Sequence, residues 1–125
     1  MAHHRIDEMV AAYLETALWS STDNTDDSGG SPLDDNYTTD DLAPETLASA
    51  VQDCAAFMWY ERENIRAAEL SPASVGHNFW LTRNHHGAGF WDLGLGNPGR
   101  NLTDAAHVYG SVDLYVGDDG KVYGG

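Results

Sequence analysis

The sequence has one cysteine, six basic residues and no apolar run that approaches the ~20 residues needed to cross a bilayer. Cys54 has no partner for an internal disulfide, and its apolar neighbours at helical spacing predict a small core residue. So few Lys and Arg argue against direct binding to nucleic acid or to an anionic membrane, because such partners are bound through cations that displace counterions. A chain of 125 residues can bury a core without disulfides or metal, so we expect a single domain over residues 1–125.

Acidic residues, by contrast, are abundant and unevenly distributed. Twenty Asp and Glu give a net charge of −14, and residues 1–75 hold 15 of these acids against three bases. A field of this sign either serves solubility alone or attracts a basic groove on another protein, including a groove that holds nucleic acid. The first 19 residues spread their charges through an amphipathic pattern and lack the basic, apolar, small-residue order of a secretory signal, so we expect a cytoplasmic protein.

Periodicity and turn residues predict the order helix, acidic loop, helix, hairpin, short helix, hairpin. Apolar residues at steps of three and four predict helices over 6–19 and from about 43 to 70, the second with the stripe Leu47, Val51, Cys54, Met58 and Ile65 and a stop at Ser71-Pro72. The segments 77–83 and 88–94 alternate like strands around the turn NHHG, and 112–116 and 121–124 flank the turn GDDG. A short helix over 102–110, with Thr103 as its cap and Gly110 as its terminator, lies between them. The expected fold class is α+β, with two amphipathic helices and a short helix packed on an antiparallel sheet of about four strands.

The first predicted hairpin contains several side chains of the types that bind ligands or take part in catalysis. A ligand site there would use His77, Arg83, Asn84, His85, His86 and Asp92. No spacing typical of a metal site supports a shared ion, so we assign no metal ligands. A hydrolytic site would need His77 or His107 as base, Asp92 to orient it and Thr82 or Ser111 as nucleophile, but no catalytic motif singles these residues out. Arg83 either binds an anionic ligand or pairs with a nearby carboxylate such as Asp92, and we favour the pairing.

The aromatic residues of this hairpin raise a second question. Neighbours in a strand face opposite sides of the sheet, so we expect Phe79 to face the helices. On that arrangement Trp80 or Trp91 lies on the other face, either as an anchor for a protein partner or under the acidic loop as a second small core. We include both tryptophans among the residues assigned to partner binding.

The predicted acidic loop, at about residues 20–43, has little that is apolar beyond Leu33 and Tyr37, which we take as its anchors to the core. Its carboxylates lack the register of a calcium-binding loop. A nucleic-acid mimic would hold carboxylates on a rigid scaffold, whereas these lie on a segment that looks flexible. The carboxylates that we assign to partner binding are Asp34, Asp35, Asp40 and Asp41 of the loop and Glu61 and Glu63 of the second helix.

The stretches HNFWLTRNHHGAGFWD (residues 77–92), LTDAAHVYGSVDLYVGDDGKVY (residues 102–123) and YLETALWSSTDN (residues 13–24) resemble a group of small acidic proteins encoded by bacteriophages and prophages. The resemblance covers most of the chain, and the group has no defined function, so it implies context and no site residues. We therefore expect a phage accessory protein, not an enzyme and without a cofactor, that binds a host or defence protein with a basic surface. The alternative is a small-ligand or metal-binding protein, with or without catalytic activity, whose site lies at the His/Arg hairpin.

Overall fold

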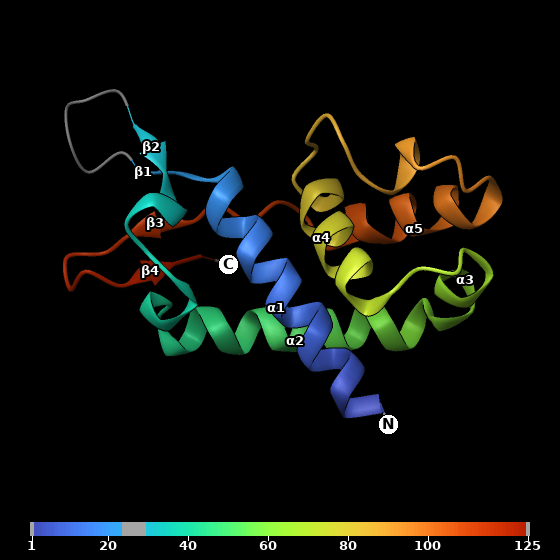
Figure 1. The fold of residues 1–125 in the computed structure, drawn as a ribbon, viewed down its shortest axis with the longest axis horizontal. Helices are drawn as coiled ribbons and strands as arrows, with labels where there is room; N and C mark the ends of the chain where they lie inside the picture. The colour runs from blue at the N-terminus through green and yellow to red at the C-terminus, as the bar shows by residue number, and fades with distance from the viewer. Residues whose placement is uncertain (1, 24–29, 125) are drawn as a thin grey trace.

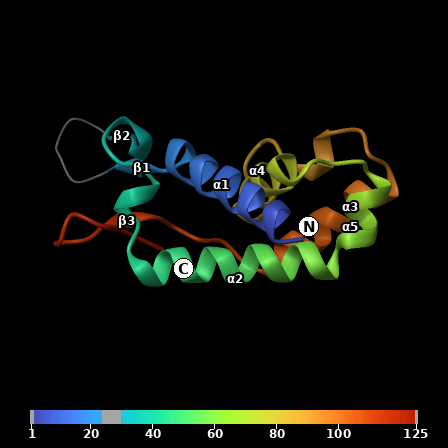
Figure 2. The same ribbon diagram turned by 60° about the horizontal axis from the view of Figure 1, so that its bottom comes forward.

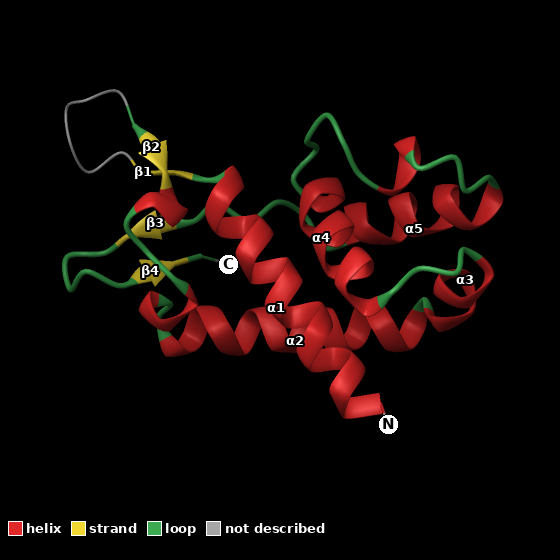
Figure 3. Ribbon diagram, in the orientation of Figure 1, coloured by secondary structure: helices red, strands yellow, loops and turns green. Residues whose placement is uncertain are grey.

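A computed structural model describes residues 2–23 and 30–124 and shows a helix-dominated fold (Figures 1 and 3). Its α-helices are α1 (Ala2–Ser20), α2 (Pro44–Tyr60), α3 (Arg62–Ala67), α4 (Pro72–Arg83) and α5 (Asn97–Val108). Strands β1 (Thr22–Asp23) and β2 (Ser31–Pro32) form one antiparallel pair, and β3 (Tyr115–Val116) and β4 (Val122–Tyr123) form another. The predicted α+β fold with an antiparallel sheet of about four strands is therefore wrong.

The main error concerns residues 77–83, which are helical and belong to α4. Ser71 caps this helix by accepting a hydrogen bond from the backbone N–H of Ser74 at 3.1 Å, and Pro72 occupies its first turn. The dipeptide Ser71-Pro72, which we expected to end a helix, instead begins one, because proline fits the first turn of a helix without losing a hydrogen bond. Residues 88–94 likewise form no strand; they contain the 3-10 turn η3 (Phe90–Asp92).

Helix α4 lies at the centre of the molecule, and its side chains are buried from Val75 to Arg83 with the partial exception of His77. It packs along α1, and Gly76 allows the close approach, because a Cβ there would collide with the backbone carbonyl of Met9. The aromatic ring of Phe79 stacks on that of Phe57 from α2 with centroids 4.2 Å apart. Phe79 is thus fully buried, as we predicted, although it lies on a helix.

Helix α1 matches its prediction, and α2 matches only at its start. The stripe Met9, Tyr13, Leu14, Ala17 and Leu18 of α1 is buried. Helix α2 begins at Pro44 as expected but ends at Tyr60 and not near residue 70. A single turn residue separates it from α3. Its buried face holds Thr46, Ala50, Cys54 and Phe57, so Cys54 lies in the core as predicted. The predicted stripe was rotated, since Leu47 and Val51 are both 41% exposed.

The acidic segment is more ordered than its composition predicts. Residues 24–29 lie outside the described part of the chain, but 30–43 contain the 3-10 turns η1 (Leu33–Asp35) and η2 (Thr39–Asp41). Leu33 is fully buried and Tyr37 packs against the core, so both predicted anchors are confirmed. The backbone N–H of Ala43 donates to the carbonyl of Val122 at 2.9 Å, which attaches the end of this segment to β4.

The C-terminal hairpin forms in the predicted place, with Tyr115 opposite Tyr123 and Val116 opposite Val122. Helix α5 starts earlier than we predicted, at Asn97, and Thr103 lies inside it, where its hydroxyl donates to the Gly99 carbonyl at 2.8 Å. Figure 2 shows the resulting layout, with the short strand pairs at one end of the long helix α2 and helices α3 and α5 at its other end.

Candidate functional site

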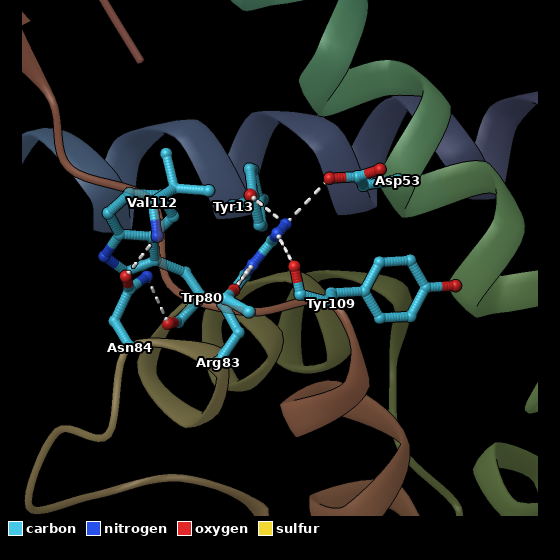
Figure 4. A network of polar contacts seen from close by, with 8 residues as sticks. Tyr13, Asp53, Trp80, Arg83, Asn84, Tyr109 and Val112 are labelled. Carbon is cyan, nitrogen blue, oxygen red and sulfur yellow. Dashed lines mark hydrogen bonds and ion pairs between the residues drawn. The ribbon is translucent and has the colours of Figure 1, made fainter. Parts of the chain in front are cut away.

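Arg83, the most prominent residue of the predicted ligand site, is 3% exposed and its guanidinium is fully engaged with protein atoms (Figure 4). Nη1 donates to the Tyr13 hydroxyl at 3.0 Å and to Asp53 Oδ2 at 2.9 Å. Nε and Nη2 donate to the carbonyls of Gly110 and Tyr109, at 2.8 and 2.9 Å. Arg83 therefore joins α4 to α1, to α2 and to the chain leaving α5.

The predicted pairing of Arg83 with Asp92 is wrong. Its carboxylate partner is Asp53 of α2, whose side chain is 33% exposed. Asp92 instead accepts a hydrogen bond from the backbone N–H of Gly89 at 3.1 Å and so holds the turn η3. The structural role that we favoured for Arg83 stands, with a different partner.

Asn84 extends the same junction. Its Oδ1 accepts from the Val112 N–H at 2.8 Å, and its Nδ2 donates to the Trp80 carbonyl at 2.9 Å (Figure 4). The Ser111 hydroxyl donates to the Arg83 carbonyl at 3.2 Å. These contacts attach the segment after α5 to the end of α4. They also engage the Asn84 side chain, which a ligand at the predicted site would contact.

Burial keeps the reactive groups around Arg83 in their neutral forms. It raises the pKa of the Tyr13 hydroxyl well above its usual range, and the adjacent Arg83 guanidinium opposes this shift only in part. Burial, aided by the Asp53 carboxylate, likewise raises the pKa of the Cys54 thiol. Among the described residues, no buried side-chain nitrogen or oxygen lacks a hydrogen-bond partner. This cluster is thus a satisfied structural network.

The predicted histidine ligands do not converge. His77 Nδ1 lies 2.9 Å from the Thr16 hydroxyl, and its ring lies beside Trp19. His85 stacks on His107 of α5 with ring centroids 4.4 Å apart, while His86 is exposed. Among the side chains that the structure describes, those of residues 6–22 and 30–124, no three from His, Cys, Asp or Glu are placed to share a metal ion.

The proposed nucleophile Thr82 is also engaged elsewhere. It is 1% exposed, and its hydroxyl accepts from the Phe90 N–H at 3.1 Å. The Ser111 hydroxyl donates to the Arg83 carbonyl, and His77 lies against Thr16, so among the described contacts neither candidate nucleophile is hydrogen-bonded to a candidate base.

The two tryptophans that we assigned to partner binding differ in exposure. Trp80 is 2% exposed, its indole N–H donates to the Ser20 hydroxyl at 2.7 Å, and its ring meets Tyr13 edge-on, so the expectation that it faces a partner is wrong. Trp91 is 56% exposed on η3. Sequence reasoning missed Trp59 and Tyr60, at 62% and 74% exposure, although a helical wheel based on Cys54 and Phe57 places both off the buried face.

The four aspartates that we assigned to partner binding within residues 30–43 lie in the two 3-10 turns. Asp34 and Asp35 belong to η1 and Asp40 and Asp41 to η2, where the Asp41 carboxylate accepts from the Thr38 N–H at 2.8 Å. This segment contacts the C-terminal hairpin through the bridge between Leu42 and Val122. We call residues 30–45 and 113–123 the acidic end (Figure 2). Its charged residues are Asp34, Asp35, Asp40, Asp41, Glu45, Asp113, Asp118 and Asp119, with Lys121 as its base.

The remaining predicted carboxylates, Glu61 and Glu63, lie at the other end of α2, at its junction with α3, and so do not join the acidic end. Within the acidic end, the Tyr123 hydroxyl donates to Asp119 at 2.6 Å and lowers the pKa of that carboxyl. The same hydrogen bond raises the pKa of Tyr123 to about 12. Asp119 therefore stays charged at neutral pH.

No family model, curated protein or solved structure matches this chain. Among the described helices, none combines the length and the apolar character that a bilayer crossing requires.

Proposed function

We propose that this chain is a phage accessory protein that acts in the host cytoplasm by binding a basic surface of a host or defence protein through its acidic end. The observation that carries the proposal is that the acidic end has defined secondary structure. Its eight carboxylates and one base lie on two 3-10 turns, on the first turn of α2 and in residues 113–121 around the C-terminal hairpin. Such a concentration of one sign attracts a complementary surface and speeds encounter with it.

The anchoring of these turns supports recognition of a fixed charge pattern. Leu33 and Leu42 are buried at 0% and 7% exposure on either side of the four loop aspartates. The flexibility that weighed against a nucleic-acid-mimicking surface is therefore reduced, because the backbone that carries these carboxylates packs into the core. A pre-ordered surface loses less conformational entropy when it binds.

An aromatic contact is available at the same end. The Tyr115 ring is 60% exposed and stacks on Tyr123 with centroids 5.8 Å apart. Tyrosine is enriched among residues that dominate binding energy at protein interfaces. The sequence suggested an anchoring role for Trp80 or Trp91; Trp80 is buried and Trp91 lies on η3, outside the acidic end, so we assign this role to Tyr115.

The test is capture of partners from host lysate with two charge-matched variants. One replaces Asp34, Asp35, Asp40 and Asp41 by Asn, which keeps an acceptor for the Thr38 cap. The control removes the same number of charges away from the acidic end, with the substitutions E8Q, E61Q, E63Q and D104N. We expect wild type and control to recover the same basic partner, and the acidic-end variant to lose it.

Loss of the partner at high salt is expected for wild type, since exposed charges more than a Debye length apart are screened. The acidic-end variant should keep or improve its thermal midpoint, because the removed like charges repel one another. Equal loss in both variants, or a partner that is itself acidic and retained in high salt, would contradict the proposal.

A further inference from the structure

A groove lies at the opposite end of α2 from the acidic end, between the start of α1, the end of α2, α3 and the start of α4. Its volume is about 620 Å³, within the range of ~300–1,000 Å³ typical of small-molecule sites. Its apolar lining consists of Ile6, Ala55, Met58, Ile65, Leu70 and Pro72. The groove therefore offers a continuous apolar trough large enough for a small molecule.

The rim of this groove carries charge opposite to that of the protein as a whole. Arg62 and Arg66, two of the six basic residues of the chain, line it together with the exposed Trp59. The Arg62 guanidinium lies 4.2 Å from the centroid of the Trp59 ring, and its Nη1 donates to the Trp59 carbonyl at 2.8 Å. With the side chains of residues 6–22 and 30–124, neither arginine forms an ion pair.

One acidic residue also lines the groove. Glu69 follows α3 with a φ of +56°, a left-handed conformation that is costly for a residue with a Cβ. Its carboxylate lowers the positive potential that the two arginines create. Among the lining residues that the structure describes, the balance is thus two cations against one anion beside an apolar trough.

We propose that this groove binds a small amphipathic carboxylate, with the apolar body in the trough and the carboxylate at Arg62 and Arg66. Arginine suits this role because its planar guanidinium donates two parallel hydrogen bonds to a carboxylate. Arg62 is held against Trp59, so part of its ordering cost is met before the ligand binds. The inference is independent of the proposed partner binding, since it concerns the other end of α2.

Calorimetric titration of the full chain with decanoate, below the concentration at which it forms micelles, tests the proposal. The neutral analogue decanamide provides the comparison. We expect saturable 1:1 binding of decanoate, about tenfold tighter than that of decanamide. R62Q and R66Q should each weaken decanoate binding about two- to fivefold, as for exposed charge pairs. E69Q should strengthen it by a similar factor.

Two controls locate the site. R100Q removes an exposed cation on α5, outside this groove, and should leave decanoate binding unchanged. A55F places a ring in the trough and should abolish binding; if that variant does not fold, the opposite effects of R66Q and E69Q still decide. The proposal is overturned by the absence of decanoate binding, by equal affinity for decanamide, by insensitivity to R62Q, R66Q and E69Q, or by binding that survives in folded A55F.

Discussion

Replacement of Arg83 by Met tests the most densely bonded part of the structure. The substitution keeps a long side chain in the buried position but removes all four hydrogen bonds, to Tyr13, Asp53, Tyr109 and Gly110. Removing one partner of a buried ion pair costs about 3–5 kcal/mol. Asp53 is one-third exposed, so water can hydrate its carboxylate after Arg83 is removed, and the loss of the ion pair costs less than for a fully buried pair. The carbonyls of Tyr109 and Gly110 would lose their hydrogen bonds, which costs about 1–3 kcal/mol for each buried group. We expect R83M to lower the free energy of unfolding by about 3–4 kcal/mol.

Urea unfolding followed by circular dichroism measures this loss. With a denaturant slope of about 2 kcal/mol/M, the midpoint should fall by about 1.5–2 M. The matched variant D53N retains an acceptor for Arg83 at a partly exposed site and should cost only about 1 kcal/mol. A midpoint for R83M within about 0.3 M of wild type would refute the reasoning. If D53N were as damaging as R83M, the ion pair and not the carbonyl contacts would dominate.

Three further predictions concern the core. G76A should destabilise the protein by at least about 2 kcal/mol in the same urea assay, despite the better helix propensity of Ala, because its Cβ collides with the Met9 carbonyl; a neutral effect would mean that α1 and α4 can separate at little cost. F79A should cost about 3–5 kcal/mol, as for a buried aromatic ring, and an unchanged thermal midpoint would contradict its central position. Because burial raises the folded-state pKa of Cys54, its contribution to stability is fully present below the ordinary thiol pKa of about 8.5 and falls as pH rises above it. The urea midpoint should therefore decline between pH 7.5 and 9.5 less steeply in C54A than in wild type, and equal slopes would show that this thiol does not contribute.

The sequence predicted α1 and the start of α2, which expose one face to solvent, but it did not predict α4, which is buried over most of its length. Helix α1 shows a clear 3.6-residue period because its other face meets water. Helix α4 is buried from Val75 onward except at His77, and its buried residues include the polar side chains Asn78, Thr82 and Arg83 among the apolar ones, so no 3.6-residue apolar period remains. Over seven residues the alternation of Phe79 and Leu81 with Asn78 and Thr82 matched a strand, and the aromatic residues favoured the same interpretation.

The partners of the candidate site residues depended on tertiary structure. Arg83 and its carboxylate partner Asp53 are 30 residues apart, so no local pattern links them. For the acidic segment, by contrast, a signal was available: Thr38 followed three residues later by Asp41 has the spacing of a capping box, and both take part in one. The polar composition predicted a loop, and the anchors Leu33 and Tyr37 were identified, but the 3-10 turns between and after them were not.

The central claim, that the ordered acidic end captures a basic partner, is tested most directly by the association rate of the recovered partner at increasing salt. For wild type and for the control variant with E8Q, E61Q, E63Q and D104N, we expect a rate that falls by at least about tenfold between low and high salt, as in electrostatically steered association. The variant with Asn at positions 34, 35, 40 and 41 should associate slowly at low salt and depend little on salt. Identical rates and salt dependence for the two charge-matched variants would contradict the account.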